Sequence, residues 1–258
     1  MATTRRRAFA RAGLVVALLA LVVSPGYATA AELTVFSAGA MEPGLRRLIP
    51  AFERETGQAV RLTIAVPNAL RQRVEAGERP DVLIAPPPVV DALTRAGLLR
   101  SEPLTVIGRV GVAVVVREGA PVPDVSTPDA LRRALLESES LVFNRASTGT
   151  YFEKVLERLG ISDAVRARTT RYPDGNAVME HVIRGTGREI GIGPITEIRP
   201  HEAKGLRFVG PLPASIQNYT AYLAGVLAKS PAADRAAGFI RHITTPAARA
   251  EFAVTGVE

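Results

Sequence analysis

Short apolar runs rich in β-branched residues alternate with amphipathic stretches along most of this chain. The apolar runs predict strands over 33–36, 61–65, 82–85, 111–116, 141–143, 169–172, 189–193, 208–209 and 220–227. Apolar residues at helical spacing predict helices over 43–56, 69–76, 89–96, 128–137, 150–159, 177–184, 231–242 and 246–252. Strands that alternate with helices in this way are typical of an α/β fold with mostly parallel sheets.

The last predicted elements, after about residue 210, are too few to form a core of their own. We therefore expect them to pack back onto the first part of the chain, which gives two lobes joined by two crossings. The first lobe is expected to contain residues 31–108 and 210–258, and the second lobe residues 109–209. Each lobe is expected to hold a mostly parallel sheet flanked by helices.

The start of the chain has the order of a secretory signal. An arginine-rich beginning precedes an apolar run over 14–23 and an A-x-A sequence at 28–30. The apolar run is about half of the roughly 20 residues that a membrane span needs. We expect residues 1–30 to be cleaved on export to the periplasm. The Sec route and the twin-arginine route both remain open, since 6–9 approximates a twin-arginine motif.

The charge and the cysteine content of the chain limit the classes of partner and of metal site that we expect. The leader holds four arginines and no acid, so its removal lowers the formal net charge from +7 to +3. The remaining basic residues form no run and few aromatics accompany them, which weighs against nucleic-acid binding. The absence of cysteine excludes disulfides and thiolate metal sites. We expect a monomer with no cofactor and no metal, and with a mild attraction for small anions.

Loops of small and hydroxyl residues precede helices at 37–41, 67–69, 145–151 and 174–176. The first turn of a helix leaves backbone N–H groups unpaired and carries partial positive charge, so several such ends can hold a desolvated anion. Ligands of α/β folds bind beyond the carboxyl ends of the strands, where these loops should converge. The alternative is that the loops are ordinary caps and turns.

Within these loops, glycines would allow close approach of the backbone, and Asn68 is expected to cap a helix. Arg145 is either a bidentate fork for a carboxylate or phosphate, or a solvated loop arginine. The candidate ligand-binding residues from the loops are Ser37, Ala38, Gly39, Ala40, Asn68, Arg145, Ser147, Thr148, Thr150, Tyr151 and Asn176.

Enzyme signatures are scarce. The sequence contains no G-x-S-x-G, H-E-x-x-H or P-loop motif, and the glycines near 185–191 have the wrong spacing for a dinucleotide site. The histidines at 181, 201 and 242 are expected to be structural or surface residues. Glu197 could act as a base, although a carboxylate there is more often a surface or inter-lobe partner. No catalytic residue is assigned, and Asp174, Glu42 and Tyr151 are weak candidates for a base.

Several long segments between residues 31 and 258 have the sequence of a known family. They are LTVFSAGAMEPGLRRLIPAFERETG, RVEAGERPDVLIAPPPVVDALTRAGLL, YFEKVLERLGI, VIRGTGREIGIGPITEI and the segment from VGPLPASIQNY to AARAEF. On these segments the chain resembles the periplasmic molybdate-type solute-binding proteins of ABC importers. The resemblance implies a two-lobed receptor that bends at a hinge and closes over a small anion. Membrane subunits of an importer would then be its partners.

The binding loops depart from the molybdate pattern. Positions that the resemblance assigns to hydroxyl ligands carry Ala40, Pro67-Asn68 and Pro194, and Pro194 joins the candidate site on this basis. Each lost hydroxyl would leave an anion acceptor unpaired, at a cost of about 1–3 kcal/mol. The opening S-A-G-A-M with G-P-I-T-E-I resembles a divergent branch that includes aconitate isomerase. Three hypotheses therefore stand: an anion receptor, an isomerase of a small polycarboxylate on the same scaffold, and a protein that only binds other proteins.

Overall fold

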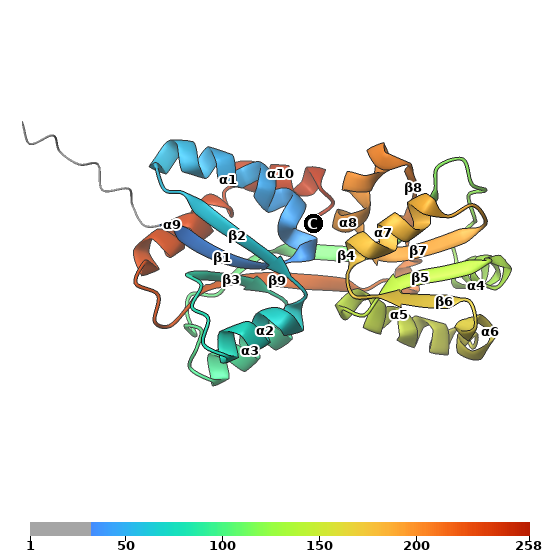
Figure 1. The fold of residues 1–258 in the computed structure, drawn as a ribbon, viewed down its shortest axis with the longest axis horizontal. Helices are drawn as coiled ribbons and strands as arrows, with labels where there is room; N and C mark the ends of the chain where they lie inside the picture. Colours follow the sequence, from blue (N-terminus) through green and yellow to red (C-terminus); the bar gives the residue numbers. More distant parts are fainter. Residues whose placement is uncertain (1–31) are drawn as a thin grey trace, which may run out of the picture.

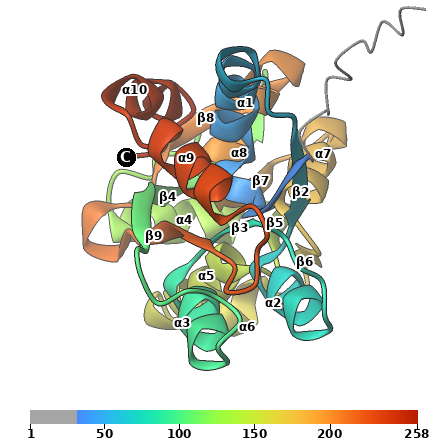
Figure 2. The ribbon, with the colours of Figure 1, turned by 90° about the vertical axis from the view of Figure 1, so that its left-hand side faces the viewer.

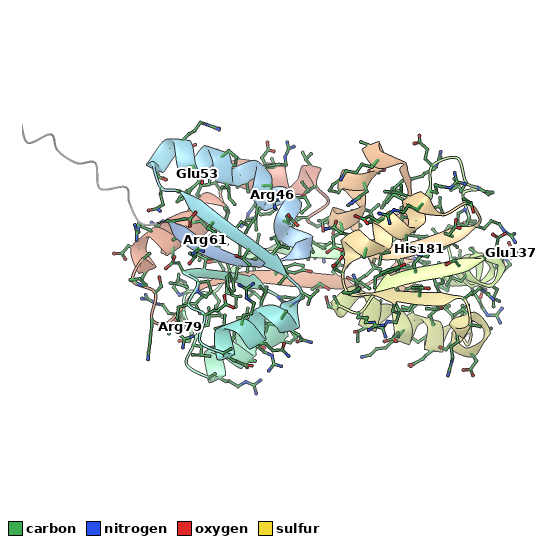
Figure 3. The ribbon with its side chains drawn as sticks, viewed as in Figure 1. Arg46, Glu53, Arg61, Arg79, Glu137 and His181 are labelled. Carbon is green, nitrogen blue, oxygen red and sulfur yellow. The ribbon has the colours of Figure 1, made fainter. Side chains whose placement is uncertain are left out.

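The structure is a computed structural model that describes residues 32–258. The predicted signal over 1–30 lies outside these residues. Two groups of strands and helices lie side by side and are joined by the long strand β4 (Thr105–Arg117) and by the segment that leads into β9 (Tyr219–Val226), as Figure 1 shows. Charged side chains such as Arg61 and Glu137 project from the outer surface (Figure 3). The mixed α/β architecture matches the fold class that the sequence predicts.

The first lobe contains five strands of a nine-stranded sheet that runs through both lobes. Its strands are β2 (Val60–Ala65), β1 (Leu33–Ala38), β3 (Val82–Ala85), β9 and the first part of β4. The first three run parallel, whereas β9 runs antiparallel to both β3 and β4. The expected parallel arrangement therefore holds for the outer strands, and the strands nearest the crossing are antiparallel.

Helices cover both faces of this sheet (Figure 2). The elements α1 (Glu42–Thr56), α9 (Ala233–His242) and α10 (Pro246–Val254) enclose one buried cluster that includes Phe52, Phe239 and Phe252. The opposite cluster, with Leu70 and Leu93, lies under α2 (Pro67–Glu75) and α3 (Pro87–Arg95). The C-terminal elements α9 and α10 thus pack on the first lobe.

The second lobe repeats this layered design. Three strands, β6 (Thr169–Tyr172), β5 (Ser140–Asn144) and β7 (Glu189–Pro194), run parallel, and β8 (Leu206–Pro211) pairs antiparallel with the second part of β4. One face carries α4 (Pro128–Glu137), α5 (Ser147–Arg158) and α6 (Ser162–Arg166). The other face carries α7 (Gly175–Arg184), α8 (Ile195–Ile198) and the 3-10 helix η2 (Arg199–Lys204).

Strand β4 passes from one lobe to the other between Gly111 and Val112. Residues up to Gly111 pair with β9, whereas residues 112–115 pair with β7 and residues 113–117 pair with β8. The chain returns through 212–218, which contains the short 3-10 helix η3 (Ala214–Ile216). Gln217 connects the two crossings, because its amide accepts from the N–H of Val112 at 3.0 Å and donates to the Val112 carbonyl at 2.9 Å. The predicted lobe boundaries lie a few residues before these crossings.

One predicted cap is wrong. Asn68 does not cap α2, because the helix already begins at Pro67 with Val66 as its N-cap, which makes no side-chain cap bond. Proline has its φ angle fixed near the helical value and needs no N–H partner, so it is favoured at the first helical position. Helix α4, by contrast, has a side-chain cap, since the Thr127 hydroxyl accepts from the N–H of Ala130.

Candidate functional site

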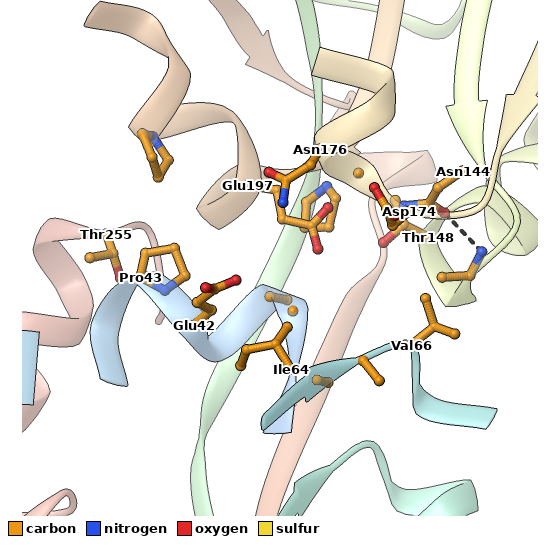
Figure 4. Close-up of a pocket in the computed structure, with 18 of the residues that line it drawn as sticks. Glu42, Pro43, Ile64, Val66, Asn144, Thr148, Asp174, Asn176, Glu197 and Thr255 are labelled. Carbon is orange, nitrogen blue, oxygen red and sulfur yellow. Dashed lines mark hydrogen bonds between the residues drawn. The ribbon is translucent and has the colours of Figure 1, made fainter. Parts of the chain in front are cut away.

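A cleft of about 1010 Å³ lies between the two lobes. All of the loops that the sequence singled out border it, and Figure 4 shows residues from both sides facing the shared space. The first lobe contributes Ala38, Gly39, Ala40, Pro67 and Ala69 from these loops. The second lobe contributes Ala146, Ser147, Thr148, Asp174, Gly175 and Asn176. The convergence predicted from the strand ends is therefore observed.

Each loop leads into a helix whose first turn meets the cleft. The 3-10 helix η1 (Gly39–Met41) begins at Gly39 and continues into α1, and α2 begins at Pro67. On the facing lobe, α5 begins at Ser147 and α7 at Gly175. First-turn N–H groups have no partner within their own helix, and they carry the positive end of the helix dipole. The cleft thus has hydrogen-bond donors and partial positive charge on both walls.

Seven of the predicted ligand-binding residues line the cleft, and five do not. Those that line it are Ala38, Gly39, Ala40, Ser147, Thr148, Asn176 and Pro194. Those outside its lining are Ser37, Asn68, Arg145, Thr150 and Tyr151. Whether the lining residues contact a ligand stays a prediction.

The residues outside the lining have other surroundings. Ser37 is fully buried and its hydroxyl donates to the Ala38 carbonyl at 3.1 Å. The Tyr151 hydroxyl donates to the carbonyl of Ile216 at 2.8 Å, which ties α5 to the returning crossing. Asn68, Arg145 and Thr150 are exposed. The fork proposed for Arg145 therefore has no place in the cleft lining, and the solvated-arginine interpretation fits.

The α5 end of the cleft is shaped by Asn144, which sequence reasoning missed. Its buried side-chain oxygen accepts from the N–H groups of Ala146 and Gly149, at 3.0 and 3.1 Å. A Cβ on Gly149 would lie 1.7 Å from the Asn144 carbonyl oxygen, so only glycine fits there. Gly149 thus serves the packing of its own loop. The signal that could have found Asn144 is an amide directly after a buried strand and before a helix N-terminus.

Glu197 supplies a carboxylate to the lining of the cleft. It projects from α8, just after β7, toward the first residues of η1 and α7. Ideal Cβ atoms on Gly39 and Gly175 would lie 3.1 Å from its Oε1 and 1.5 Å from its Oε2. Oε2 has almost no accessible surface and no hydrogen-bond partner among the described residues. Burial, with smaller contributions from the charges of Asp174 and Glu42, raises the pKa of Glu197 to about 7.

The surroundings of two neighbours of Glu197, Tyr222 and His201, define where each carries a hydrogen. Burial raises the pKa of the Tyr222 hydroxyl well above its ordinary value, and the charge of Glu197 adds to the effect, so the phenol stays neutral. Tyr222 belongs to β9 and also lines the cleft. His201 is buried, with Nδ1 at 2.9 Å from the Glu197 carbonyl oxygen. Since a carbonyl only accepts, Nδ1 carries a hydrogen.

Several basic side chains around the cleft form ion pairs with acidic side chains. Arg46 lies 2.7 Å from Glu42, and Arg199 lies 3.1 Å from Glu202. Arg47, which also lines the cleft, pairs with Glu251 at 2.7 Å. Lys204 completes the basic lining. An entering anion therefore meets arginines that are already paired with carboxylates.

The remaining histidines have structural contacts, as expected. His181 lies 2.9 Å from the Tyr172 hydroxyl, and His242 packs edge-on against Phe52. Across 32–258, no set of three or more His, Asp or Glu side chains is arranged to hold a metal ion. In the same residues, no helix has the length and apolar character to cross a bilayer.

Comparison with known proteins places this geometry in a family. The family model described as bacterial extracellular solute-binding protein matches residues 33–258. The chain is 27% identical over 221 residues to an aconitate isomerase of Pseudomonas sp., covering 83% of this chain and 82% of that protein.

Solved structures with the same fold include the periplasmic molybdate-binding protein of Azotobacter vinelandii. Its TM-score is 0.73 at 18% identity, over 88% of this chain and 99% of that one. A sulfate-binding protein of Mycobacterium tuberculosis H37Rv has a TM-score of 0.70 at 18% identity, over 88% of this chain and 86% of that one. These likenesses show the fold, whereas the family match spans nearly the whole described chain. The protein therefore belongs to the bacterial extracellular solute-binding proteins.

Proposed function

We propose that this protein captures a small anion between its two lobes in the periplasm and delivers it to an ABC importer. The observation that carries the proposal is the convergence of four helix N-termini, from both lobes, on one cleft. Desolvated anions bind such ends through unpaired N–H groups and the helix dipole. The proposed protein is a monomer that needs no cofactor and binds no nucleic acid, and its leader over 1–30 directs export.

Capture proceeds by closure of the lobes. The moving units are residues 31–108 with 210–258 and residues 109–209, and the crossings of β4 and 212–218 act as the hinge. A ligand that contacts helix ends on both walls favours the closed state, because those contacts are complete only when the lobes meet. The Gln217 bonds to Val112 hold the two crossings together during this motion.

The ligand class that fits best is a small organic polyacid. The cleft of about 1010 Å³ lies at the upper end of the roughly 300–1,000 Å³ usual for small-molecule sites. That volume exceeds what a lone tetrahedral oxyanion needs. Ala40 and Pro194 also line the cleft without any hydroxyl to donate. Likeness to an aconitate isomerase over 83% of the chain supports the same class of ligand.

A second candidate function is isomerisation of a small polycarboxylic acid by proton transfer. It is favoured by that curated relative, which is 27% identical across most of both chains. Capture and isomerisation would use the same cleft and the same helix ends. They differ in whether a side chain in the cleft exchanges a proton with carbon.

A ligand panel tests the proposal. Purified protein is heated with molybdate, tungstate, sulfate, phosphate, citrate, cis-aconitate or trans-aconitate, and affinities are then measured by calorimetry. A ligand at about 100 times its dissociation constant adds roughly 2.7 kcal/mol of stability, which a thermal shift detects. We expect the organic acids to stabilise the protein more than the oxyanions do.

Matched variants tie the effect to the cleft. Thr148 is buried in the lining, and Thr170 is exposed on β6. Thr148→Val should weaken binding of the stabilising acid, whereas Thr170→Val should leave the affinity unchanged. Equal losses in both variants, or stabilisation by none of the seven anions, would reject capture in this cleft.

A further inference from the structure

We propose that Glu197 is a general base that moves a proton between two carbon atoms of an unsaturated polycarboxylic acid bound in the cleft. The inference rests on the proposed capture of an organic acid and gives that cleft a catalytic group. It assigns a role to the carboxylate whose Oε2 has no hydrogen-bond partner in the part of the chain that the structure describes.

The position of the Glu197 side chain supports a catalytic role. The carboxylate reaches the first residues of two helix ends, Gly39 on one lobe and Gly175 on the other. It is not the cap of α7, because the Asp174 side chain already fills that role by accepting from the N–H of Ala177 at 3.0 Å. Figure 4 shows Glu197 and Glu42 facing the space between α1 and α7. A carboxylate with unused acceptor capacity therefore lines the space where an anion is expected.

The surroundings of Glu197 suit it to accept a proton and give it back. Burial, Asp174 at the start of α7 and Glu42 on α1 raise its pKa to about 7. Both the acid and its conjugate base are then populated near neutral pH, which is where proton transfer by a positioned carboxyl is most effective. Arg46 lies against Glu42 and offsets part of that charge.

The other ionisable groups near Glu197 come from η2 and β9. His201 on η2 meets the backbone carbonyl of Glu197 and therefore does not hold its carboxylate. Arg199 is held by Glu202, and Lys204 lies in the same lining. On β9, Tyr222 stays neutral and can donate a hydrogen bond to negative charge that develops on a bound acid.

The reaction balances without an added reagent. Glu197 takes a proton from a methylene group that lies between a carboxylate and a carbon–carbon double bond. The C–H electron pair enters the conjugated system, and the negative charge spreads onto the carboxylate oxygens. First-turn N–H groups of α5 and α7, with the Tyr222 hydroxyl, stabilise those oxygens. Glu197 then returns the proton to the carbon at the other end of the allylic system. The double bond thereby moves to the former methylene carbon, and it can form there in either the cis or the trans geometry.

Proton NMR on the purified protein with cis- or trans-aconitate in D2O buffer tests this assignment. We expect interconversion of the two isomers, with or without deuterium at the methylene carbon. Glu197→Gln keeps the size and polarity but removes the base, so its rate should fall by about 10²–10⁴-fold. The same variant should still show a thermal shift with either acid. Glu75→Gln, at an exposed position on α2, is the matched control and should keep the wild-type rate.

The outcomes separate the inference from the proposed function. Binding of either acid without interconversion overturns the role of Glu197 and leaves capture standing. Interconversion at an equal rate in Glu197→Gln also overturns it, since the base then lies elsewhere. Failure of both acids to bind overturns the organic-acid ligand and the base together. A pH profile of kcat/KM that rises through about 7 in the wild type and is flat in the residual activity of the variant supports the assignment.

Discussion

The carboxylate of Glu197 occupies the space that a side chain at position 175 would need. A Cβ on Gly175 would lie 1.5 Å from Glu197 Oε2 and 2.6 Å from its Cδ. Both residues belong to the second lobe, yet the same carboxylate also approaches Gly39 of the first lobe. The position of one glycine thus sets where the charged group of the cleft can lie.

Gly175→Ala should displace Glu197 and destabilise the protein. The new methyl group overlaps a carboxylate whose Oε2 has almost no accessible surface, and overpacking of this kind costs about 1–3 kcal/mol. We expect a lower free energy of unfolding in urea, together with weaker binding of the organic acid. Gly238→Ala is the control, because a Cβ there meets only the end of the Arg241 side chain at 3.7 Å.

Gly238 lies inside α9, where alanine is the better helix former. The control should therefore raise stability by about 0.4–1 kcal/mol. A Gly175→Ala variant as stable as the wild type, with unchanged affinity, would contradict the packing described for Glu197.

Stability should depend on pH through Glu197. Its pKa is raised from 4.5 to about 7 in the folded protein, so folding favours the protonated form. The resulting stabilisation is complete below pH 4.5 and is lost as the pH rises through about 7. The full span amounts to roughly 3 kcal/mol. Urea unfolding between pH 5 and 8 should give a steeper decline for the wild type than for Glu197→Gln. Parallel curves for the two proteins would mean that Glu197 titrates normally.

Asn144→Ala should loosen the α5 wall of the cleft. Two buried or part-buried N–H groups, those of Ala146 and Gly149, lose their acceptor, and each unsatisfied group costs about 1–3 kcal/mol. We expect both lower thermal stability and weaker ligand binding. Asn144→Asp retains the acceptor oxygen and should keep more of both properties. If alanine and aspartate behave alike, the hydrogen bonds do not shape the loop.

Gln217→Ala should weaken the connection between the two crossings. The variant leaves the N–H and carbonyl of Val112 without their side-chain partner, which we expect to lower the free energy of unfolding by about 1–3 kcal/mol. Gln72→Ala, on the exposed side of α2, removes an amide without such bonds and should change stability by less than about 0.5 kcal/mol. Urea titrations of the two variants beside the wild type provide the measurement, and similar midpoints would argue against the link.

Ala40→Ser tests the oxyanion side of the cleft. Ala40 is buried in η1 and lines the cleft, so a serine hydroxyl there can donate to a bound anion. A gain of about 0.5–1.5 kcal/mol, or up to about tenfold in affinity, is expected for molybdate by calorimetry. Ala96→Ser, at the exposed end of α3, should leave the affinity as it is. An unaltered affinity in Ala40→Ser would place this position away from the ligand.

The sequence was sufficient for features that depend on local pattern and on general rules of topology. A continuous apolar run predicted β3, and apolar residues at helical spacing predicted α4. Convergence of the helix ends followed because parallel strands end at the same edge of a sheet. The directions of individual side chains could not be predicted from these patterns and rules. Arg145 turned out to be exposed, while Glu197, on a helix of four residues, turned inward. That difference arises from contacts between segments that are distant along the chain, which no local spacing encodes.

Strand β9 lies between β3 and β4, although it comes near the end of the chain. The sheet that starts at residue 33 therefore remains in two separate pieces until residues 219–226 have been made and inserted. The second lobe has no such requirement, since its strands are complete by residue 211. On a ribosome or during passage through a membrane pore, the lobe encoded first would accordingly be the last to fold.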